Sequence, residues 1–240
     1  MLKRLFLQMD DTTVLNWHGQ LASASVDQVK KLGVPVTLMS SRSAQEMLPL
    51  VKQLGASSAQ VALNGGLIYR LAHGQVQPLL TQALLKKNVY YLLKSLMTVF
   101  PDLCQSYFTA KHWVAYRDDD KMQAISATAG MEPLLVGPAA YLHPQLPVIK
   151  IQLAPSSTQE RVRLQQFFDY LAIPNFKVQL TVQGVFEISS QSLNIASTVQ
   201  QVMVFDGLHN DEIVGFGEDW NQLPFLPHYN DRQMAAQAAR

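Results

Sequence analysis

Four polar clusters in the 240-residue sequence contain the residue types that bind phosphate groups or divalent cations. Each cluster ends or follows a short apolar run, and the four are Gln8-Met9-Asp10-Asp11-Thr12, Ser40-Ser41-Arg42, Asn64-Gly65-Gly66 and Glu218-Asp219-Trp220-Asn221. Carboxylate oxygens are preferred ligands of Mg²⁺, and hydroxyl, guanidinium and backbone N–H groups bind phosphate oxygens. The clusters therefore predict phosphate chemistry, provided that the fold brings them together. Gln8 is the exception, because a neutral amide neither attacks a phosphoryl group nor carries charge.

The apolar runs beside these clusters have the lengths and spacing of alternating strands and helices. Strands are expected at residues 2–8, 34–41, 59–69 and 212–218, and helices at residues 22–33, 43–55 and 194–205. This order favours a parallel, doubly wound α/β sheet. Ligands of such sheets bind beyond the carboxyl ends of the strands. Since the polar clusters stand at those ends, we expect them to line one crevice.

From residue 77 the pattern changes, and it returns to the earlier one at about residue 184. A long helical stretch is expected at residues 79–100, strands at 104–110, 112–117, 147–154, 176–182 and 185–190, and a helix at 157–172. Adjacent strands with interspersed helices predict a small α+β module. We interpret residues 77–183 as a domain inserted into a core formed by residues 1–76 and 184–240. Within the insert, residues 139–147 have the composition of a linker.

Composition and charge limit the class of protein. A balance of 19 basic and 18 acidic residues, with a net charge of +1, gives no reason to propose nucleic acid or a membrane surface as a partner. The single cysteine, Cys104, excludes an intrachain disulfide and fits a reducing compartment. No apolar run is long enough to span a bilayer, and no N-terminal stretch resembles a secretory leader. We therefore expect a soluble cytoplasmic protein.

Taken in order, the four clusters resemble the motifs of the haloacid dehalogenase (HAD) superfamily, specifically its Cof-type phosphatases with a class IIB cap. The opening MLKRLFLQMDDTTVL resembles the family strand that delivers Asp-x-Asp-Gly-Thr, and VPVTLMSSRS resembles the strand that ends in Thr-Gly-Arg. VALNGGLIY is close to the Asn-Gly-Ala turn before the cap, and EIVGFGEDWNQLPFL resembles Phe-Gly-Asp-Gly-x-Asn-Asp. The resemblance implies a Rossmann-like HAD core with an inserted α+β cap of the C2 type.

The resemblance also implies a reaction. In that family the first Asp attacks the phosphoryl group, and the second Asp acts as general acid and base. A hydroxyl of the second motif and a Lys of the third motif hold phosphate oxygens, while carboxylates of the fourth motif help to bind Mg²⁺. This is phosphoryl transfer by charge neutralisation and in-line positioning around a nucleophile.

Carried over position by position, the match is partial. The nucleophile position falls on Gln8, and the position of the phosphate-binding Lys falls on Ile195. The matching positions imply that Asp10 is the acid and base, and that Thr12, Ser40, Ser41, Arg42, Asn64 and Gly65 contact phosphate. The implied metal ligands are Asp10, Glu218, Asp219 and Asn221. Glu218 stands for an Asp and Gln222 for the final Asp, so Mg²⁺ binding is in doubt. Members of the family continue for some tens of residues after this motif, whereas this sequence ends at Arg240. The resemblance therefore leads us to expect that a closing strand and helix are missing.

Several of these residues have other interpretations. Asp10 could be the nucleophile in a shifted register, with Thr12 two residues later, or it could cap the following turn. Ser40 and Ser41 could serve as the N-cap of the helix at residues 43–55. Arg42 could face a substrate or the solvent, and the Asn64-Gly65 pair could simply form a tight turn.

Three hypotheses about function follow. The first is a HAD homologue whose phosphatase activity is impaired or absent, and which holds a phosphorylated small molecule; it depends on Gln8, Ile195 and Gln222. The second is a weak Mg²⁺-dependent phosphatase of sugar phosphates or similar phosphoesters, which depends on the retained residues. The third is a scaffold whose cap or whose sheet edge near residues 213–217 pairs with another chain. The expected assembly is a monomer or a homodimer.

Overall fold

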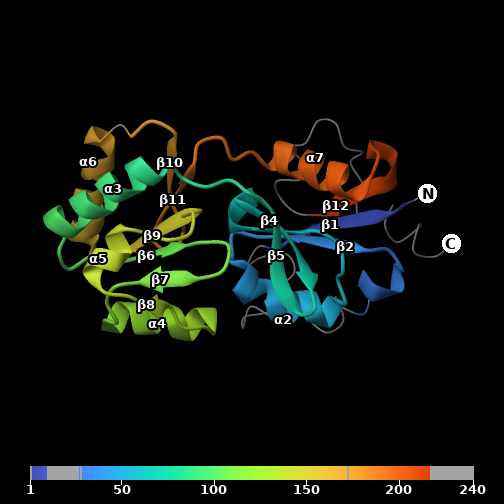
Figure 1. Cartoon of the computed structure of the whole chain (residues 1–240), viewed down its shortest axis with the longest axis horizontal. Coiled ribbons are helices and arrows are strands. Elements are labelled where there is room, and N and C mark those ends of the chain that lie inside the picture. Colours follow the sequence, from blue (N-terminus) through green and yellow to red (C-terminus); the bar gives the residue numbers. More distant parts are fainter. Residues whose placement is uncertain (1, 10–26, 28, 172, 217–240) are drawn as a thin grey trace. The chain divides into compact units, whose positions relative to one another are not determined.

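The computed structural model describes residues 2–9, 27, 29–171 and 173–216, and these form two compact units. The first unit combines residues 1–80 with residues 194–240, and the second comprises residues 81–193. Each unit contains one six-stranded sheet (Figure 1). The chain therefore leaves the first unit, completes the second, and returns.

The sheet of the first unit has the strand order β12-β1-β2-β3-β4-β5. Its strands are β1 (Arg4–Gln8), β2 (Val36–Met39), β3 (Gln60–Ala62), β4 (Leu67–Ala72), β5 (Gln75–Thr81) and β12 (Ile213–Phe216). The four strands from β12 to β3 run parallel, while β4 is antiparallel to β3. The expected parallel α/β sheet is thus confirmed, with a two-strand extension at one edge.

Helices cover both faces of this sheet (Figure 1). Helix α7 (Ile195–Asp206) packs on the face that contains Phe6 and Ile68, and helix α2 (Ala44–Leu54) lies on the other face. Because both faces are covered, successive residues of β1 are buried rather than alternating with exposed ones. Two short 3₁₀ helices, η1 (Leu63–Gly65) and η2 (Asn210–Glu212), follow β3 and precede β12.

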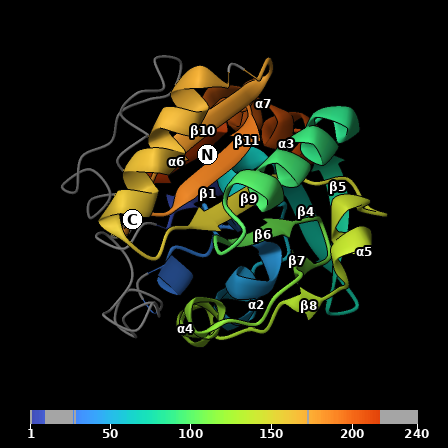
Figure 2. The same ribbon diagram turned by 90° about the vertical axis from the view of Figure 1, so that its left-hand side faces the viewer.

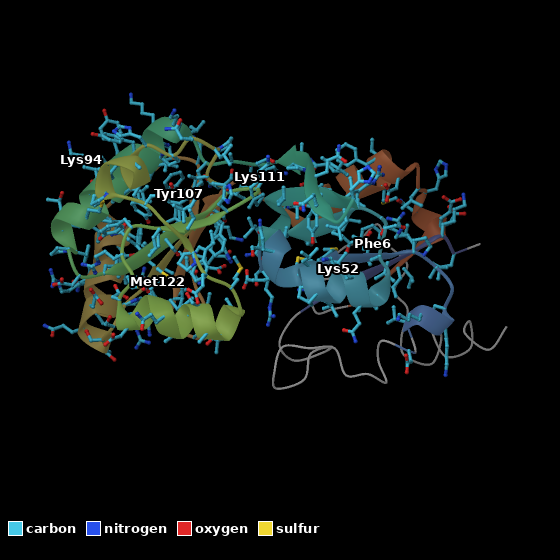
Figure 3. The ribbon with its side chains drawn as sticks, turned by 60° about the horizontal axis from the view of Figure 1, so that its bottom comes forward. Phe6, Lys52, Lys94, Tyr107, Lys111 and Met122 are labelled. Atoms are coloured by element: carbon cyan, nitrogen blue, oxygen red, sulfur yellow. The ribbon has the colours of Figure 1, made fainter. Side chains whose placement is uncertain are left out.

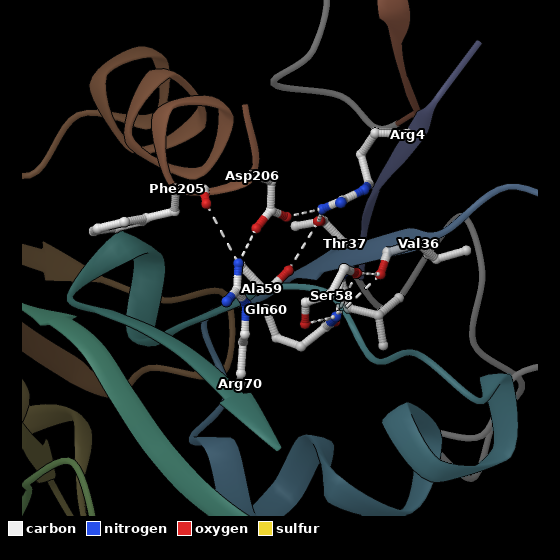
Figure 4. Close-up of polar contacts among 10 residues, drawn as sticks. Arg4, Val36, Thr37, Ser58, Ala59, Gln60, Arg70, Phe205 and Asp206 are labelled. Atoms are coloured by element: carbon white, nitrogen blue, oxygen red, sulfur yellow. Dashed lines mark hydrogen bonds and ion pairs between the residues drawn. The ribbon is translucent and has the colours of Figure 1, made fainter. Parts of the chain in front are cut away.

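Side chains join much of β2 to the segment that leads into β3. The two strands share a single register pair, Met39 with Val61. The buried amide of Gln60 accepts a hydrogen bond from the N–H of Leu38 (2.8 Å) and donates one to the carbonyl of Val36 (3.0 Å). Thr37 Oγ1 donates to the carbonyl of Ala59 (2.8 Å). These side chains satisfy backbone groups that a longer ladder would otherwise pair (Figure 4).

The sheet of the second unit has the order β10-β11-β9-β6-β7-β8 and is antiparallel except between β7 and β8. Its strands are β6 (Cys104–Phe108), β7 (Trp113–Ala115), β8 (Leu134–Leu135), β9 (Lys150–Ala154), β10 (Phe176–Leu180) and β11 (Phe186–Ser190). Its helices are α3 (Lys86–Val99), α4 (Asp120–Ala129), α5 (Pro138–Leu142) and α6 (Thr158–Tyr170).

An apolar core lies between this second sheet and its helices. Helices α3, α5 and α6 contribute Leu92, Tyr141 and Phe168, and the sheet contributes Tyr107 and Ile151 among others. Figure 2 shows α3 and α6 along one side of the sheet, and Figure 3 shows Tyr107 within the second unit and Phe6 within the first. The α+β architecture expected for the insert is therefore observed.

The largest difference from the sequence-based expectation is at the start of the insert. The helix predicted at residues 79–100 is formed only by α3, whereas residues 75–81 form β5. His73 and Gly74 both have positive φ angles, of 51° and 76°, which suits a tight hairpin turn between β4 and β5. The hairpin thus overrides the local helical pattern, and the first unit extends beyond the expected boundary at residue 76 to Leu80.

Two further segments differ from expectation. The second unit extends to Leu193 rather than ending at residue 183, because β11 pairs with both β9 and β10. The linker-like residues 139–147 contain most of α5, whose Tyr141 is fully buried in the core of the second unit. An isolated aromatic residue among Pro and His gave no periodic pattern from which a helix could be predicted.

A buried ionic cluster joins α7 to the sheet of the first unit. The carboxylate of Asp206, the last residue of α7, binds the guanidinium groups of both Arg4 in β1 and Arg70 in β4 (Figure 4). The side chains of Arg4 and Asp206 are only 8% and 6% exposed. Arg4 also donates to Thr37 Oγ1 (3.0 Å). Burial by itself raises the pKa of the Asp206 carboxyl, but the hydrogen bonds and charges of the two arginines outweigh it and hold the pKa below its ordinary value.

We predict that Asp206→Asn lowers the free energy of unfolding by about 3–5 kcal/mol at neutral pH, because it leaves the buried charge of Arg4 without its partner. Asp211→Asn, at an exposed carboxylate, serves as the control and should change it by less than about 0.5 kcal/mol. Urea denaturation at pH 7 measures both.

The difference in the free energy of unfolding between the wild type and Asp206→Asn should depend on pH. A carboxyl whose pKa is depressed on folding stabilises the protein above its unfolded pKa, about 3.9, and this stabilisation is lost as the pH falls through the folded pKa. The difference between wild type and Asp206→Asn should therefore shrink below about pH 4. A difference that stayed constant through that range would contradict the ionic role of Asp206.

Candidate functional site

Three of the polar clusters meet at the carboxyl ends of neighbouring strands. Gln8, the last residue of β1, lies opposite Met39 in the register of β2, and the N–H of Met9 donates to the carbonyl of Met39 (2.8 Å). The N–H of Ser40 donates to the carbonyl of Val61 in β3 (3.0 Å). Gln8 is half-buried and Ser40 is buried. The expected convergence of strand ends is thus present for these positions.

The turn after β3 is tied to the segment after β2. The N–H of Asn64 donates to the carbonyl of Ser40 (3.0 Å), and the N–H of Leu63 donates to the carbonyl of Arg42 (2.9 Å). Leu63, Asn64 and Gly65 have positive φ angles of 53°, 57° and 93°. Such a conformation is costly for leucine, so these hydrogen bonds help to hold a strained backbone next to Ser40.

Helix α7 begins beside this turn. The α carbon of Gly65 lies so close to α7 that a β carbon there would stand 2.5 Å from Thr198 Oγ1. Thr198 is fully buried, and its hydroxyl donates to the carbonyl of Asn194 (3.0 Å). The N-terminus of α7 therefore belongs to the same cluster of strand ends. Thr198 could not be identified from the sequence, because no motif specifies a residue that only fills the space left by a glycine.

The start of α7 does not present a cation. Ile195, at the position of the family lysine, is the first residue of the helix, and its side chain packs on the apolar core of the first unit. The side chain of Asn194 caps the helix by accepting from the N–H groups of Ala196 (2.8 Å) and Ser197 (3.2 Å). The helix N-terminus is thus capped by the side chain of Asn194, and its first residue is apolar.

The two serines after β2 do not cap the next helix. The N-cap of α2 is Ser43, whose hydroxyl accepts from the N–H of Glu46 while the Glu46 carboxylate accepts from the N–H of Ser43 (2.7 Å). Ser40 Oγ instead accepts from the N–H of Arg42 (3.1 Å). The capping role considered for Ser40 and Ser41 is therefore wrong. The Ser-x-x-Glu pattern that starts at Ser43 is the capping box that indicates the correct position.

Several candidate residues lie outside the described part of the chain. Asp10 and Thr12 follow β1 in the sequence, and Glu218, Asp219 and Asn221 follow β12. The ends of these two strands are adjacent, since Leu7 is opposite Phe216. Among the described residues, no group of three or more His, Cys, Asp or Glu side chains could hold a metal ion.

Magnesium was the cofactor implied by the family resemblance. The implied ligands Asp10, Glu218, Asp219 and Asn221 all lie outside the described residues. We therefore derive no chemical step through the ion.

Cys104 is not a candidate nucleophile. Its side chain is 3% exposed, and burial, followed by the neighbouring Asp119, raises the pKa of the thiol to about 12. A thiol with that pKa is almost entirely protonated at neutral pH, and the thiolate is the reactive form.

We predict that Gly65→Ala destabilises the protein by about 2 kcal/mol or more, because the new methyl group meets both an unfavourable φ and the hydroxyl of Thr198. Gly74→Ala is the matched control, since Gly74 also has a positive φ but nothing lies within 4 Å of its added β carbon. Adding Thr198→Ala to Gly65→Ala should recover part of the loss through a positive coupling. Urea unfolding of the wild type, Gly65→Ala, Thr198→Ala and their double variant measures the cycle, with Gly74→Ala as a fifth protein. Equal losses for Gly65→Ala and Gly74→Ala would contradict the close approach.

Comparison with known proteins places these features in a family. The family of haloacid dehalogenase-like hydrolases matches residues 5–232. A Haemophilus influenzae protein that carries the provisional name of a phosphatase is 24% identical over 234 residues, which is 95% of this chain and 84% of that protein. In the part of the chain that the structure describes, no helix is long and apolar enough to cross a membrane.

Solved structures agree on the fold. A haloacid dehalogenase-like hydrolase from Bacteroides thetaiotaomicron superposes with a TM-score of 0.78 at 17% identity, covering 94% of this chain and 86% of that one. A structure described as a HAD subclass IIB sugar phosphatase gives a TM-score of 0.70 at 11% identity, covering 92% and 82%. The Cof-type core and inserted cap expected from the motifs are confirmed. The chain belongs to the haloacid dehalogenase-like hydrolase family.

Proposed function

We propose that this chain is a member of the family whose phosphatase activity is impaired or absent, and that it holds a phosphorylated small molecule at the strand ends. The observation that carries the proposal is the position of Gln8 at the end of β1, opposite Met39, the residue before Ser40. That is where the family places its nucleophilic carboxylate. A carboxamide does not form an acyl phosphate, so covalent catalysis through this position is lost.

A second substitution, Ile195 at the position that the resemblance assigns to a lysine, also disfavours catalysis. Phosphoryl transfer depends on cations that offset the charge of the phosphate oxygens. Ile195 removes one such cation, and its packing against the core of the first unit gives the side chain a structural role instead. Loss of both the nucleophile and a stabilising cation favours binding over turnover.

The remaining groups support binding. Ser40 Oγ accepts from the N–H of Arg42, which leaves the serine hydroxyl proton available for a phosphate oxygen. The turn at Asn64 and Gly65 is fixed next to Ser40 by backbone hydrogen bonds. Arg42 supplies a partly exposed cation on the same segment. These groups could hold a phosphate without a covalent step.

The alternative is a weakly active phosphatase. It is favoured by the retention of Ser40, Arg42 and Asn64 at the strand ends, and by the fold shared with a subclass IIB sugar phosphatase. In that case Asp10 would be the nucleophile, or would act as acid and base for an attacking water. Sugar phosphates and an aryl phosphate are therefore the substrates to assay.

We predict no phosphate release by the wild type from sugar phosphates or an aryl phosphate in the presence of Mg²⁺. The double variant Gln8→Asp with Ile195→Lys restores the missing nucleophile and cation and should release phosphate above background. Gln8→Asn is the matched control, because it has the length of the aspartate without its charge, and it should remain inactive. Wild-type turnover that Asp10→Asn abolishes would overturn the proposal in favour of the phosphatase.

Binding is tested separately. Inorganic phosphate should raise the midpoint of thermal unfolding of the wild type, because a ligand that binds the folded state stabilises it. Ser40→Ala should reduce this increase. Absence of any shift with phosphate or sugar phosphates, together with absence of turnover, would contradict a binding function and favour a scaffold.

A further inference from the structure

Among the residues that the structure describes, the two sheets have four edge strands, and three of them are poorly suited to pair with another chain. Strand β5 contains Pro78, which has no N–H to donate. Strand β8 has only two residues, and the residues Ile213 and Val214 of β12 are buried. Of these four described edge strands, only β10 combines five residues, no proline and a largely exposed surface. Short strands and prolines are common protections of sheet edges, and β10 has neither a proline nor so short a length.

The backbone groups that β10 directs away from its sheet can be identified from its pairing with β11. Outside the strand itself, the N–H of Thr181 donates to Val185 and the carbonyl of Asn175 accepts from Gln191. Both pairs continue the register in which Phe176 faces Ser190 and Leu180 faces Phe186. Because bonded and non-bonded pairs alternate in antiparallel ladders, odd-numbered residues bond to β11. The N–H and C=O groups of Val178 and Leu180 and the C=O of Phe176 therefore point to the free edge, whereas the N–H of Phe176 donates to the carbonyl of Ile173 (3.4 Å).

The side chains of these residues are apolar and accessible. Val178 is 36% exposed and Leu180 is 48% exposed, while Phe176 packs partly against the core of the second unit. Helix α6 lies on the same face, since Phe168 packs on Phe186, the residue opposite Leu180. Lys177 and Gln179 alternate with the apolar residues and occupy the other face. The edge thus combines open hydrogen-bonding groups with an apolar strip.

We propose that β10 pairs with β10 of a second copy of this chain, antiparallel and about a two-fold axis at Val178. In this register Val178 faces its own counterpart, and Phe176 faces Leu180 on both sides of the axis. Lys177 faces Gln179, so no like charges are opposed. The N–H groups of Val178 and Leu180 in each copy donate across the axis, which gives about four backbone hydrogen bonds. The second-unit sheets of the two copies thus join into one continuous sheet.

The sequence of β10 favours this register over its neighbours. An axis at Lys177 would place the two lysines directly opposite each other, which is destabilising across a strand pair. An axis at Gln179 would leave Phe176 opposite Val182, beyond the end of β10. Self-complementary pairing of one patch is the rule at two-fold interfaces. The occupant that best matches the edge is therefore an identical strand.

The interface is small, so the dimer is expected to be weak, with a dissociation constant on the order of micromolar to tens of micromolar. Sedimentation velocity of the full chain between about 1 and 300 µM should show a concentration-dependent shift from monomer to dimer. A wild type that stays monomeric over this range would overturn the proposal.

Two lysine substitutions locate the interface. Val178→Lys places two ammonium groups opposite each other at the axis and should abolish the dimer. Val182→Lys makes the same change of side chain at a fully exposed position outside β10 and should leave the dimer unchanged. Urea unfolding of both variants checks that the fold is retained. A dimer that survives Val178→Lys, or that is lost equally in Val182→Lys, would contradict pairing through β10.

A cross-linking test does not depend on the stability of the lysine variants. Opposed residues in a bonded antiparallel pair have α carbons about 5.5 Å apart, within the range that a disulfide spans. Val178→Cys should form a covalent dimer under mild oxidation, whereas Val182→Cys, which does not face itself, should react much more slowly. The native Cys104 is buried and should not contribute. Equal rates for the two variants would overturn the register.

Discussion

The carboxylate of Asp206 joins two stretches of chain that the second unit separates in the sequence. Arg4 and Arg70 belong to the segment before the insert, and Asp206 belongs to the segment after it. Buried charges are tolerated when they are paired and hydrogen-bonded, so each side of this contact depends on the other. The contact fixes the C-terminal end of α7, and the packing of Thr198 on Gly65 fixes its N-terminal end. With both ends held, α7 closes one face of the sheet and delivers Ile195 and Asn194 to the site.

This arrangement separates the scaffold of the site from its chemistry. The strand ends, the turn at Leu63 and Asn64, and the start of α7 are brought together by backbone hydrogen bonds and close packing. None of these contacts requires a charged group at Gln8 or Ile195. The proposed loss of the nucleophile and of a phosphate-binding cation is therefore compatible with this framework.

The four parallel strands of the first sheet could be predicted from the sequence, because buried parallel strands have continuous apolar runs. The ends of β1, β2 and β3 were placed next to Gln8, Ser40 and Asn64 for the same reason. The helix predicted over residues 79–81 was wrong, since a turn with two positive φ angles folds that segment back as β5.

Other features of the site depend on contacts between distant residues. The approach of Thr198 to Gly65 and the binding of Asp206 by two arginines have no local pattern. The cap considered for α2 at Ser40 and Ser41 is instead formed by Ser43, although the Ser-x-x-Glu pattern of Ser43 is present in the sequence. The free edge of β10 is also invisible in the sequence, because strand order in a sheet is a property of the whole fold.

The junction between β2 and β3 has a consequence for how this chain tolerates mutation. In most sheets the ladder is made by backbone groups, so side chains can change without breaking it. Here the amide of Gln60 and the hydroxyl of Thr37 perform part of that task. Substitution at either position removes backbone partners as well as a side chain, so these two residues are expected to vary as little as a structural proline or glycine. The segment that positions Ser40 thus depends on the identity of two side chains, whereas the pairing of sheet strands usually depends on backbone groups alone.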